Sequence, residues 1–241
     1  MAETHFTEPT TEYWQEIEDH DRPIPEAPWK FKYPALLLDD KFLYLPIRPL
    51  PSSTPDSAPK EAVASLSLTQ CSFAVSETLA SQLASLIKWK YSSHIDIVIG
   101  LPTLGLGIAA AVAKELGHSR YIPLGYSRKF WFKDELSTNL TSITSPDMIK
   151  KVYLDPALLP LVKDQRVLIV DDAISSGQTL LAIWNFLESE QLNCRVTSVG
   201  VAMKQGSRWK EVLGEERAEK VVGVFDSPLL RAVEGGWVVR E

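Results

Sequence analysis

The sequence has few of the residues from which disulfide frameworks and structural metal sites are built. Its 241 residues include two cysteines, Cys71 and Cys194, and contain no CxxC pair or Cys/His cluster. This pattern argues against a disulfide-stabilised fold or a structural zinc site and is typical of a reducing compartment. The four histidines are dispersed, and we interpret them as structural residues: His5, His20, His94 and His118.

The sequence also lacks an excess of basic residues. The formal net charge is −6, and the first thirty residues carry eight acids and only two bases, which equals the whole imbalance. The remainder is neutral overall, without the positive charge that nucleic-acid binding usually requires. We therefore expect no nucleic-acid partner.

No apolar run is long enough to predict a membrane span. The longest charge-free stretch, residues 97–113, is seventeen residues long and is interrupted by glycines and a proline, so it predicts a strand, a loop and a helix instead. The N-terminus is acidic and has no apolar segment, so we expect no secretory signal. These features predict a cytoplasmic protein with no membrane partner.

Apolar patterning along the chain predicts alternating strands and helices. The expected strands are 95–99, 121–124, 152–154, 167–170, 195–203 and 221–225, and the expected helices are 75–90, 106–116 and 180–187. Such an order predicts parallel strands joined by right-handed crossovers, and therefore a doubly wound α/β domain.

The remaining segments are polar and rich in turn-forming residues. Residues 1–34 predict an acidic, partly ordered N-terminal extension, which leaves the main domain as 35–241. Residues 34–46 alternate in polarity and predict a hairpin around Asp39-Asp40. Residues 126–150 are polar and predict a long irregular loop, a feature that is usually a functional lid or disordered.

The strongest chemical signal is the segment 167–179, VLIVDDAISSGQT. Its first four residues predict a buried strand, and Asp171 and Asp172 follow at the carboxyl end, where open α/β sheets bind ligands. A loop of small and hydroxyl residues then opens a helix, so backbone N–H groups and hydroxyls can bind a phosphate there. The loop has no Walker lysine, which argues against a nucleoside-triphosphate P-loop.

These thirteen residues resemble the 5-phosphoribosyl 1-pyrophosphate signature of type I phosphoribosyltransferases. The resemblance implies that Asp171 and Asp172 hold the ribose 2′- and 3′-hydroxyls and contact Mg²⁺ directly or through those hydroxyls or water. It implies that the loop binds the 5′-phosphate through Ala173, Ile174, Ser175, Ser176, Gly177, Gln178 and Thr179. Gln178 replaces the usual second glycine and is similar to the xanthine phosphoribosyltransferase branch.

Two further segments resemble functional loops of this family. Residues 100–107, GLPTLGLG, follow a predicted strand and resemble the pyrophosphate-binding loop, where backbone N–H groups bind the ligand. That resemblance assigns Leu101, Pro102, Thr103, Leu104 and Gly105 to the substrate site.

The second of these segments, residues 126–133, YSRKFWFK, resembles the mobile lid of adenine, xanthine and orotate phosphoribosyltransferases. Arg128, Lys129 and Lys133 would neutralise charge on the departing pyrophosphate, and lid closure would exclude water. In related enzymes one lid cation serves the neighbouring subunit, which implies a homodimer.

From about Pro34 onward the order of elements resembles that of xanthine and adenine phosphoribosyltransferases. The resemblance implies a hood built from about 35–60 and 203–241, which contacts the base. It implies transfer of the phosphoribosyl group to a nucleobase, preferably a purine, with Mg²⁺ and release of pyrophosphate. Lys204 lies near the position where related purine enzymes contact the exocyclic oxygen of the base.

Three other interpretations are open at this stage. The protein could be an orotate-like enzyme that accepts a pyrimidine. It could be a regulatory protein that binds the sugar pyrophosphate without catalysis, although residues 1–60 show no helix-turn-helix pattern. It could also be an unrelated flavodoxin-like or receiver-like module, in which the aspartate pair serves magnesium binding and phosphorylation.

Overall fold

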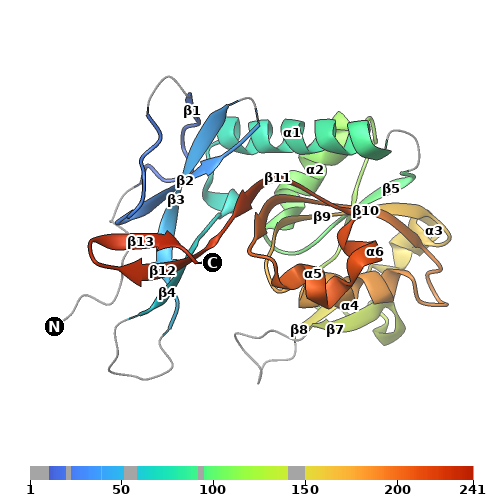
Figure 1. Ribbon diagram of the computed structural model, residues 1–241. Helices are drawn as coiled ribbons and strands as arrows, with labels where there is room; N and C mark the ends of the chain where they lie inside the picture. The colour runs from blue at the N-terminus through green and yellow to red at the C-terminus, as the bar shows by residue number, and fades with distance from the viewer. Residues whose placement is uncertain are drawn as a thin grey trace.

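The computed structural model of the chain describes residues 11–19, 23–38, 40–51, 59–91, 95–140 and 150–240. Within these ranges the chain forms a parallel sheet flanked by helices and, beside it, an antiparallel sheet (Figure 1). No helix in this part of the chain combines the length and the apolar character needed to cross a bilayer. His5, His20, His94 and Asp39 lie outside the described residues.

The central sheet has five parallel strands in the order β11-β10-β9-β5-β6. Its members are β5 (Ile97–Gly100), β6 (Ile122–Pro123), β9 (Arg166–Ile174), β10 (Arg195–Gln205) and β11 (Val221–Ser227). Each strand lies within a few residues of its predicted range, because these short apolar runs are buried on both faces of the sheet. The predicted doubly wound α/β domain is confirmed.

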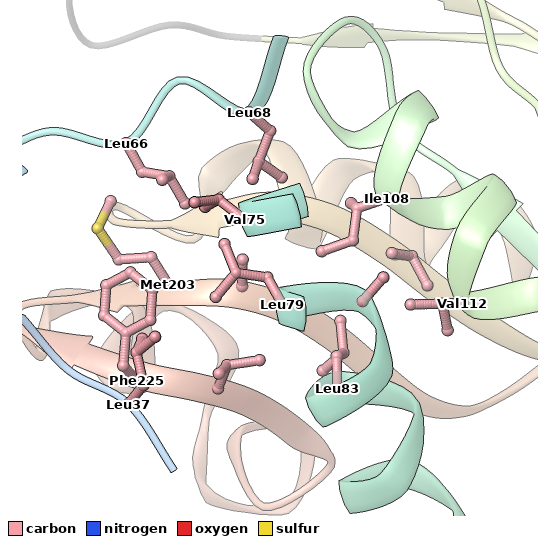
Figure 2. Close-up of a cluster of buried hydrophobic side chains, with 14 of the residues drawn as sticks. Leu37, Leu66, Leu68, Val75, Leu79, Leu83, Ile108, Val112, Met203 and Phe225 are labelled. Carbon is pink, nitrogen blue, oxygen red and sulfur yellow. The ribbon is translucent and has the colours of Figure 1, made fainter. Parts of the chain in front are cut away.

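Helices α1 (Phe73–Tyr91) and α2 (Gly105–Glu115) cover one face of this sheet. Figure 2 shows Leu79 and Leu83 of α1 beside Val112 of α2, with Met203 and Phe225 of the sheet in the same cluster. Because successive strand residues point to opposite faces, Leu168 and Val170 belong to this core, whereas Val167 and Ile169 belong to the core on the other face.

The second face is covered by shorter helices. The largest is α4 (Gln178–Leu187), whose predicted apolar side is buried at Leu180, Ile183, Trp184 and Leu187. The other helical segments on this face are η2 (Asp134–Leu136), η3 (Pro156–Leu158), α3 (Leu159–Val162), α5 (Arg208–Leu213) and α6 (Glu215–Ala218). The short helix η1 (Leu68–Gln70) lies on the first face, where Leu68 is buried.

Segments from both ends of the chain form the antiparallel sheet, which we call the hood. It runs in the order β1-β3-β4-β12-β13, and β2 pairs with β3. Its strands are β1 (Glu18–Asp19), β2 (Lys32–Leu36), β3 (Lys41–Pro49), β4 (Glu61–Ala64), β12 (Leu229–Val233) and β13 (Gly236–Val239). In Figure 1 the hood stands at the left of the parallel sheet, and β11 leads into it. A hood from N- and C-terminal segments and the β2–β3 hairpin are therefore confirmed. Its predicted limits, about 35–60 and 203–241, stay a prediction, and residues 203–227 lie in β10, β11 and the helices between them.

Part of the N-terminal extension packs onto this structure. Tyr13 and Trp14 are buried in the core that α1 covers, and the Trp14 indole N–H donates to the Ser65 carbonyl at 3.1 Å. The predicted domain boundary after residue 34 falls within β2, whose residues on both sides pair with β3. That division of the chain stays a prediction.

The prediction of an irregular loop across 126–150 is wrong for part of its length. Residues 134–136 form η2, and β7 (Ser137–Leu140) pairs with β8 (Lys150–Tyr153). Leu136 and Leu140 are buried in the core on the α4 side. These two leucines are the buried apolar residues beside and within β7, and the residues around them are polar. Two apolar residues form too weak a pattern to predict a strand from the sequence. Residues 141–149 lie outside the described ranges.

Candidate active site

The aspartate pair lies within the central strand rather than after it. Strand β9 was expected to end at Val170, but it continues to Ile174, because Asp171, Ala173 and Ile174 stay paired with β10. Both Asp171 and Asp172 are half-buried. The backbone N–H of Asp172 donates to Asp171 Oδ1 at 2.9 Å, which fixes the first carboxylate against the strand.

The environment of this pair disfavours two negative charges. Burial, and then repulsion from Asp172, raises the pKa of Asp171 well above its ordinary value. Burial also raises the pKa of Asp172. Hydrogen-bond donors or a cation would stabilise the ionised form of both carboxylates. A sugar that carries a bound metal ion supplies both.

The loop predicted to bind pyrophosphate, residues 100–107, follows β5, the strand next to β9 in the sheet. The Leu101 N–H donates to the Val170 carbonyl at 3.0 Å, and the Leu101 side chain is buried. The peptide bond between Pro102 and Thr103 is cis. The Tyr126 hydroxyl donates to the Pro102 carbonyl at 2.9 Å, which joins this loop to the segment that was expected to be a lid.

The predicted phosphate loop has the geometry of an anion site. Gly177 has φ +79° and precedes α4, so the loop turns sharply into the first N–H groups of that helix. Ser176 Oγ accepts from the Gln178 N–H at 3.4 Å, and Ser175 is exposed. The loop therefore places hydroxyl and backbone amide groups beside the aspartates.

A cavity of about 320 Å³ brings these segments together, which we call the aspartate cavity. Most of the predicted substrate residues line it: Pro102, Thr103, Leu104, Asp171, Asp172, Ala173, Ile174, Ser175, Ser176, Gly177 and Thr179. Leu101, Gly105, Gln178 and Lys204 were also predicted but do not line it. Sequence reasoning missed Leu180, Val199 and Val201 and did not assign Tyr126 to the cavity wall. Side chains alternate between the two faces of a strand, so Val199 and Val201 of β10 share one face. That alternation was the signal from which both could have been predicted.

The three predicted lid cations lie outside the walls of this cavity. Arg128 pairs with Asp134 at 3.1 Å, and Lys133 lies 3.9 Å from Glu135. Lys129 has no acidic partner among the residues that the structure describes. The Trp131 indole N–H donates to Asp155 Oδ2 at 3.2 Å, so the segment is attached beside β8 and η3.

Lys204 lines a second cavity, of about 440 Å³, which we call the hood cavity. Its ammonium lies 3.0 Å from Asp226 Oδ1. Tyr33 from the hood and Trp209 from α5 lie in the same wall.

The donor set fits a magnesium ion that arrives with its substrate. In the described part of the chain, no three His, Cys, Asp or Glu side chains gather closely enough to enclose a metal. Magnesium usually binds through one or two carboxylates plus substrate oxygens, and Asp171 and Asp172 supply that number.

The phosphoribosyl transferase domain family has a model that matches residues 72–222, which is more than half of the chain. The chain belongs to this family. The matched range contains the aspartate pair, both predicted loops and the lid segment, while most of the hood lies outside it. The architecture is the type I phosphoribosyltransferase fold, with the antiparallel sheet as its hood.

Solved structures with the same fold include two adenine phosphoribosyltransferases. The enzyme from Rhodothermus marinus has a TM-score of 0.53 and 16% identity and covers 75% of this chain and 93% of its own. The enzyme from Leishmania tarentolae has a TM-score of 0.52 and 16% identity, with coverage of 72% and 79%.

A third similar structure is the APRTase from Giardia lamblia in complex with 9-deazaadenine. It has a TM-score of 0.53 and 18% identity and covers 75% of this chain and 93% of its own. No protein with a curated description matches the sequence. At these identities the structural likeness concerns the fold.

Proposed function

We propose that this protein transfers the 5-phosphoribosyl group from 5-phosphoribosyl 1-pyrophosphate to a purine base and releases pyrophosphate. The observation that carries the proposal is the aspartate cavity, which unites a carboxylate pair, an anion-binding loop at a helix start and a second strand-to-helix loop. A ligand with vicinal hydroxyls and two separate phosphate groups would use all three. The family membership supports the same reaction.

In this proposal each wall of the cavity binds a different part of the ligand. Asp171 and Asp172 accept hydrogen bonds from the ribose 2′- and 3′-hydroxyls. The loop 173–179 donates to the 5′-phosphate, and residues 102–104 face the pyrophosphate. Fixing the sugar between two anion sites aligns its C1 with an incoming base nitrogen, and such alignment lowers the barrier without a protein nucleophile.

Asp171 and Asp172 are also the residues that would hold Mg²⁺. Bound there, the ion would neutralise part of the charge on the leaving pyrophosphate. The raised pKa of Asp171 supports this assignment, since a bound cation would offset both the burial of the carboxylate and its repulsion from Asp172.

Lid closure completes the proposed site. Arg128, Lys129 and Lys133 gather on the segment that Tyr126 joins to the Pro102 loop. On closing, these cations would approach the pyrophosphate and exclude water from the reacting carbon. We further propose that the enzyme works as a homodimer, with a lid cation reaching the neighbouring subunit.

The preference for a purine is supported by the similar structures. Two of them are adenine phosphoribosyltransferases, and a third is in complex with 9-deazaadenine. The hood cavity, at about 440 Å³, has room for a two-ring base.

A panel of nucleobases incubated with 5-phosphoribosyl 1-pyrophosphate and Mg²⁺ tests the proposal, with nucleotide and pyrophosphate measured together. We expect equal amounts of both products with at least one purine. The double variant Asp171→Asn/Asp172→Asn should abolish binding of the sugar pyrophosphate while the far-ultraviolet circular dichroism stays unchanged. Tight binding without turnover of any base would instead favour a regulatory protein, and absence of binding would contradict both.

A further inference from the structure

The N-terminal extension closes the hood sheet into a ring. Strands of the hood pair in the sequence β2-β3-β4-β12-β13, which leaves β13 at the end of the sheet. Trp29, which lies just before β2, forms an antiparallel bridge with Trp237 of β13. The Trp29 N–H donates to the Trp237 carbonyl at 2.9 Å, and the Trp237 N–H donates to the Trp29 carbonyl at 2.7 Å. We call these strands together with Trp29 the hood ring, and the Trp29–Trp237 bridge its seam.

Every member of the hood ring contributes to one small apolar cluster. Its fully buried side chains come from three of the strands: Ile47 of β3, Ala62 of β4 and Leu230 of β12. The aromatic side chains of Trp29, Tyr33 and Trp237 pack against them. The rings of Trp29 and Tyr33 meet edge to face, with their centroids 5.0 Å apart. The seam is therefore held by side-chain packing as well as by backbone hydrogen bonds.

The seam joins the two strands of the hood ring that reach the hood cavity. Tyr33 of β2 and Val239 of β13 both line that cavity. Each lies only a few residues beyond the seam, on the same stretch of backbone as Trp29 or Trp237. The two backbones are in contact at the seam, since a Cβ atom added to Gly236 would lie 2.8 Å from the Trp29 carbonyl carbon. A displacement of Trp29 is therefore transmitted to the cavity wall.

Without the seam, the β12–β13 hairpin would be attached to the hood on one side alone. Residues 229–231 of β12 pair with β4, and a two-stranded hairpin is only marginally stable by itself. The seam gives β13 a second neighbour and removes an open sheet edge. Val239 is consequently fixed relative to Tyr33, instead of moving with a loosely attached hairpin.

The hood cavity lies next to the aspartate cavity. Gly177 lines the aspartate cavity, and Trp209 lines the hood cavity. A Cβ atom added to Gly177 would lie 3.0 Å from Trp209 Cα, so the two walls touch. A base that is joined to the C1 of a sugar in the aspartate cavity can therefore extend into the hood cavity.

We infer that Trp29 is a positioning residue for base binding, an inference that rests on the proposed function. Trp29 closes the hood ring and so holds Tyr33 and Val239 in one fixed arrangement at the hood cavity. The whole ring lies outside residues 72–222, which the family model matches. The N-terminal extension is thus a working part of the site in this chain.

Calorimetry on the full chain tests the inference, with ribose 5-phosphate and adenosine 5′-monophosphate as probes. In the natural protein we expect the nucleotide to bind more tightly, because its base enters the hood cavity. In Trp29→Ala the nucleotide should lose about tenfold in affinity, which corresponds to a cavity wall that is correctly arranged about a tenth of the time. Ribose 5-phosphate has no base to place there and should bind unchanged. Trp29→Phe keeps an aromatic ring against Tyr33 and should retain most of the nucleotide affinity.

Two neighbouring glycines provide a second variant and its control. Gly236→Ala pushes the Trp29 carbonyl away from β13 and should cause the same loss while the Trp29 side chain is intact. Gly235→Ala also strains the backbone, since Gly235 has φ +86°. Its added Cβ atom, however, meets only Pro28 Cγ, at 3.8 Å. That variant should lose stability and keep both affinities.

Three outcomes would overturn the inference while the proposed function stands. The first is a nucleotide that binds the natural protein no more tightly than ribose 5-phosphate does. The second is a contribution of adenine that survives both Trp29→Ala and Gly236→Ala. The third is an equal loss of affinity for both probes in these variants, which would indicate general destabilisation. Failure of ribose 5-phosphate to bind the natural protein would contradict the proposed function, and the inference with it.

Discussion

Gly105 at the start of α2 lies directly against Asp171 on the central strand. A Cβ atom added to Gly105 would be 2.5 Å from Asp171 Oδ1 and 2.8 Å from its Cα. Because no side chain intervenes, the loop 101–105 can approach the carboxylate closely. The glycine was predicted as a substrate contact, and in the structure it supports the site by leaving room for the aspartate.

Gly105→Ala should therefore damage the site through Asp171. The added methyl group meets strand backbone, which cannot move aside, so we expect a loss of about 1–3 kcal/mol in unfolding free energy. Affinity for 5-phosphoribosyl 1-pyrophosphate should fall at least about tenfold, equivalent to 1.4 kcal/mol. Gly107→Ala in the same helix is the control, since no atom lies within 4 Å of its added Cβ atom. Equal effects of the two variants would show that the Asp171 contact is unimportant.

Asp171→Asn should stabilise the ligand-free protein at neutral pH. The native pKa of Asp171 is raised above the ordinary value of 3.8, so between these two values the native state binds more protons than the unfolded state. Stability then decreases as pH rises through that window, and the asparagine variant avoids this loss. Urea unfolding from pH 4 to pH 8 should show a higher midpoint for the variant at pH 8 and a smaller difference near pH 4. A difference independent of pH would contradict the raised pKa.

Gly177→Ala should weaken phosphate binding and the fold together. The φ of +79° costs a residue with a side chain about 1–2 kcal/mol, and the new methyl group would also press against Trp209. We expect lower affinity for ribose 5-phosphate by calorimetry and a lower melting temperature. Gly117→Ala is the control, because Gly117 also has a positive φ, +87°, and open space around its added Cβ atom. That variant should lose stability and keep its phosphate affinity; if it loses affinity as well, the effect is global.

Lys129→Ala should lower turnover more than binding. Lys129 has no acidic partner in the described part of the chain, so its charge is available to the departing pyrophosphate when the lid closes. We expect kcat to fall about tenfold or more, with little change in the dissociation constant of the sugar pyrophosphate. Lys163→Ala, an exposed lysine beyond α3, serves as the comparison. Unchanged kcat in the Lys129 variant would remove this residue from the mechanism.

The sequence alone determined the core elements and the consecutive order of central strand residues, aspartate pair and loop, although the strand continues past the pair to Ile174. The apolar runs of β5, β9 and β10 and the buried side of α4 follow from local periodicity, which records which side chains must avoid water. The pair and its loop were recognisable because strand, carboxylates, hydroxyls and helix start are consecutive in the chain. Strand β7 was missed because only Leu136 and Leu140 anchor it.

Tertiary structure decided the contacts that join distant segments. Gly105 meets Asp171 because β5 and β9 are neighbours in the sheet, and Lys204 meets Asp226 because β10 and β11 pair in one particular register. In the hood, β4 pairs with β12 from the other end of the chain. Local patterns state which residues are buried, but they do not state which strand lies beside which. That choice is made by packing and backbone hydrogen bonds over the whole fold.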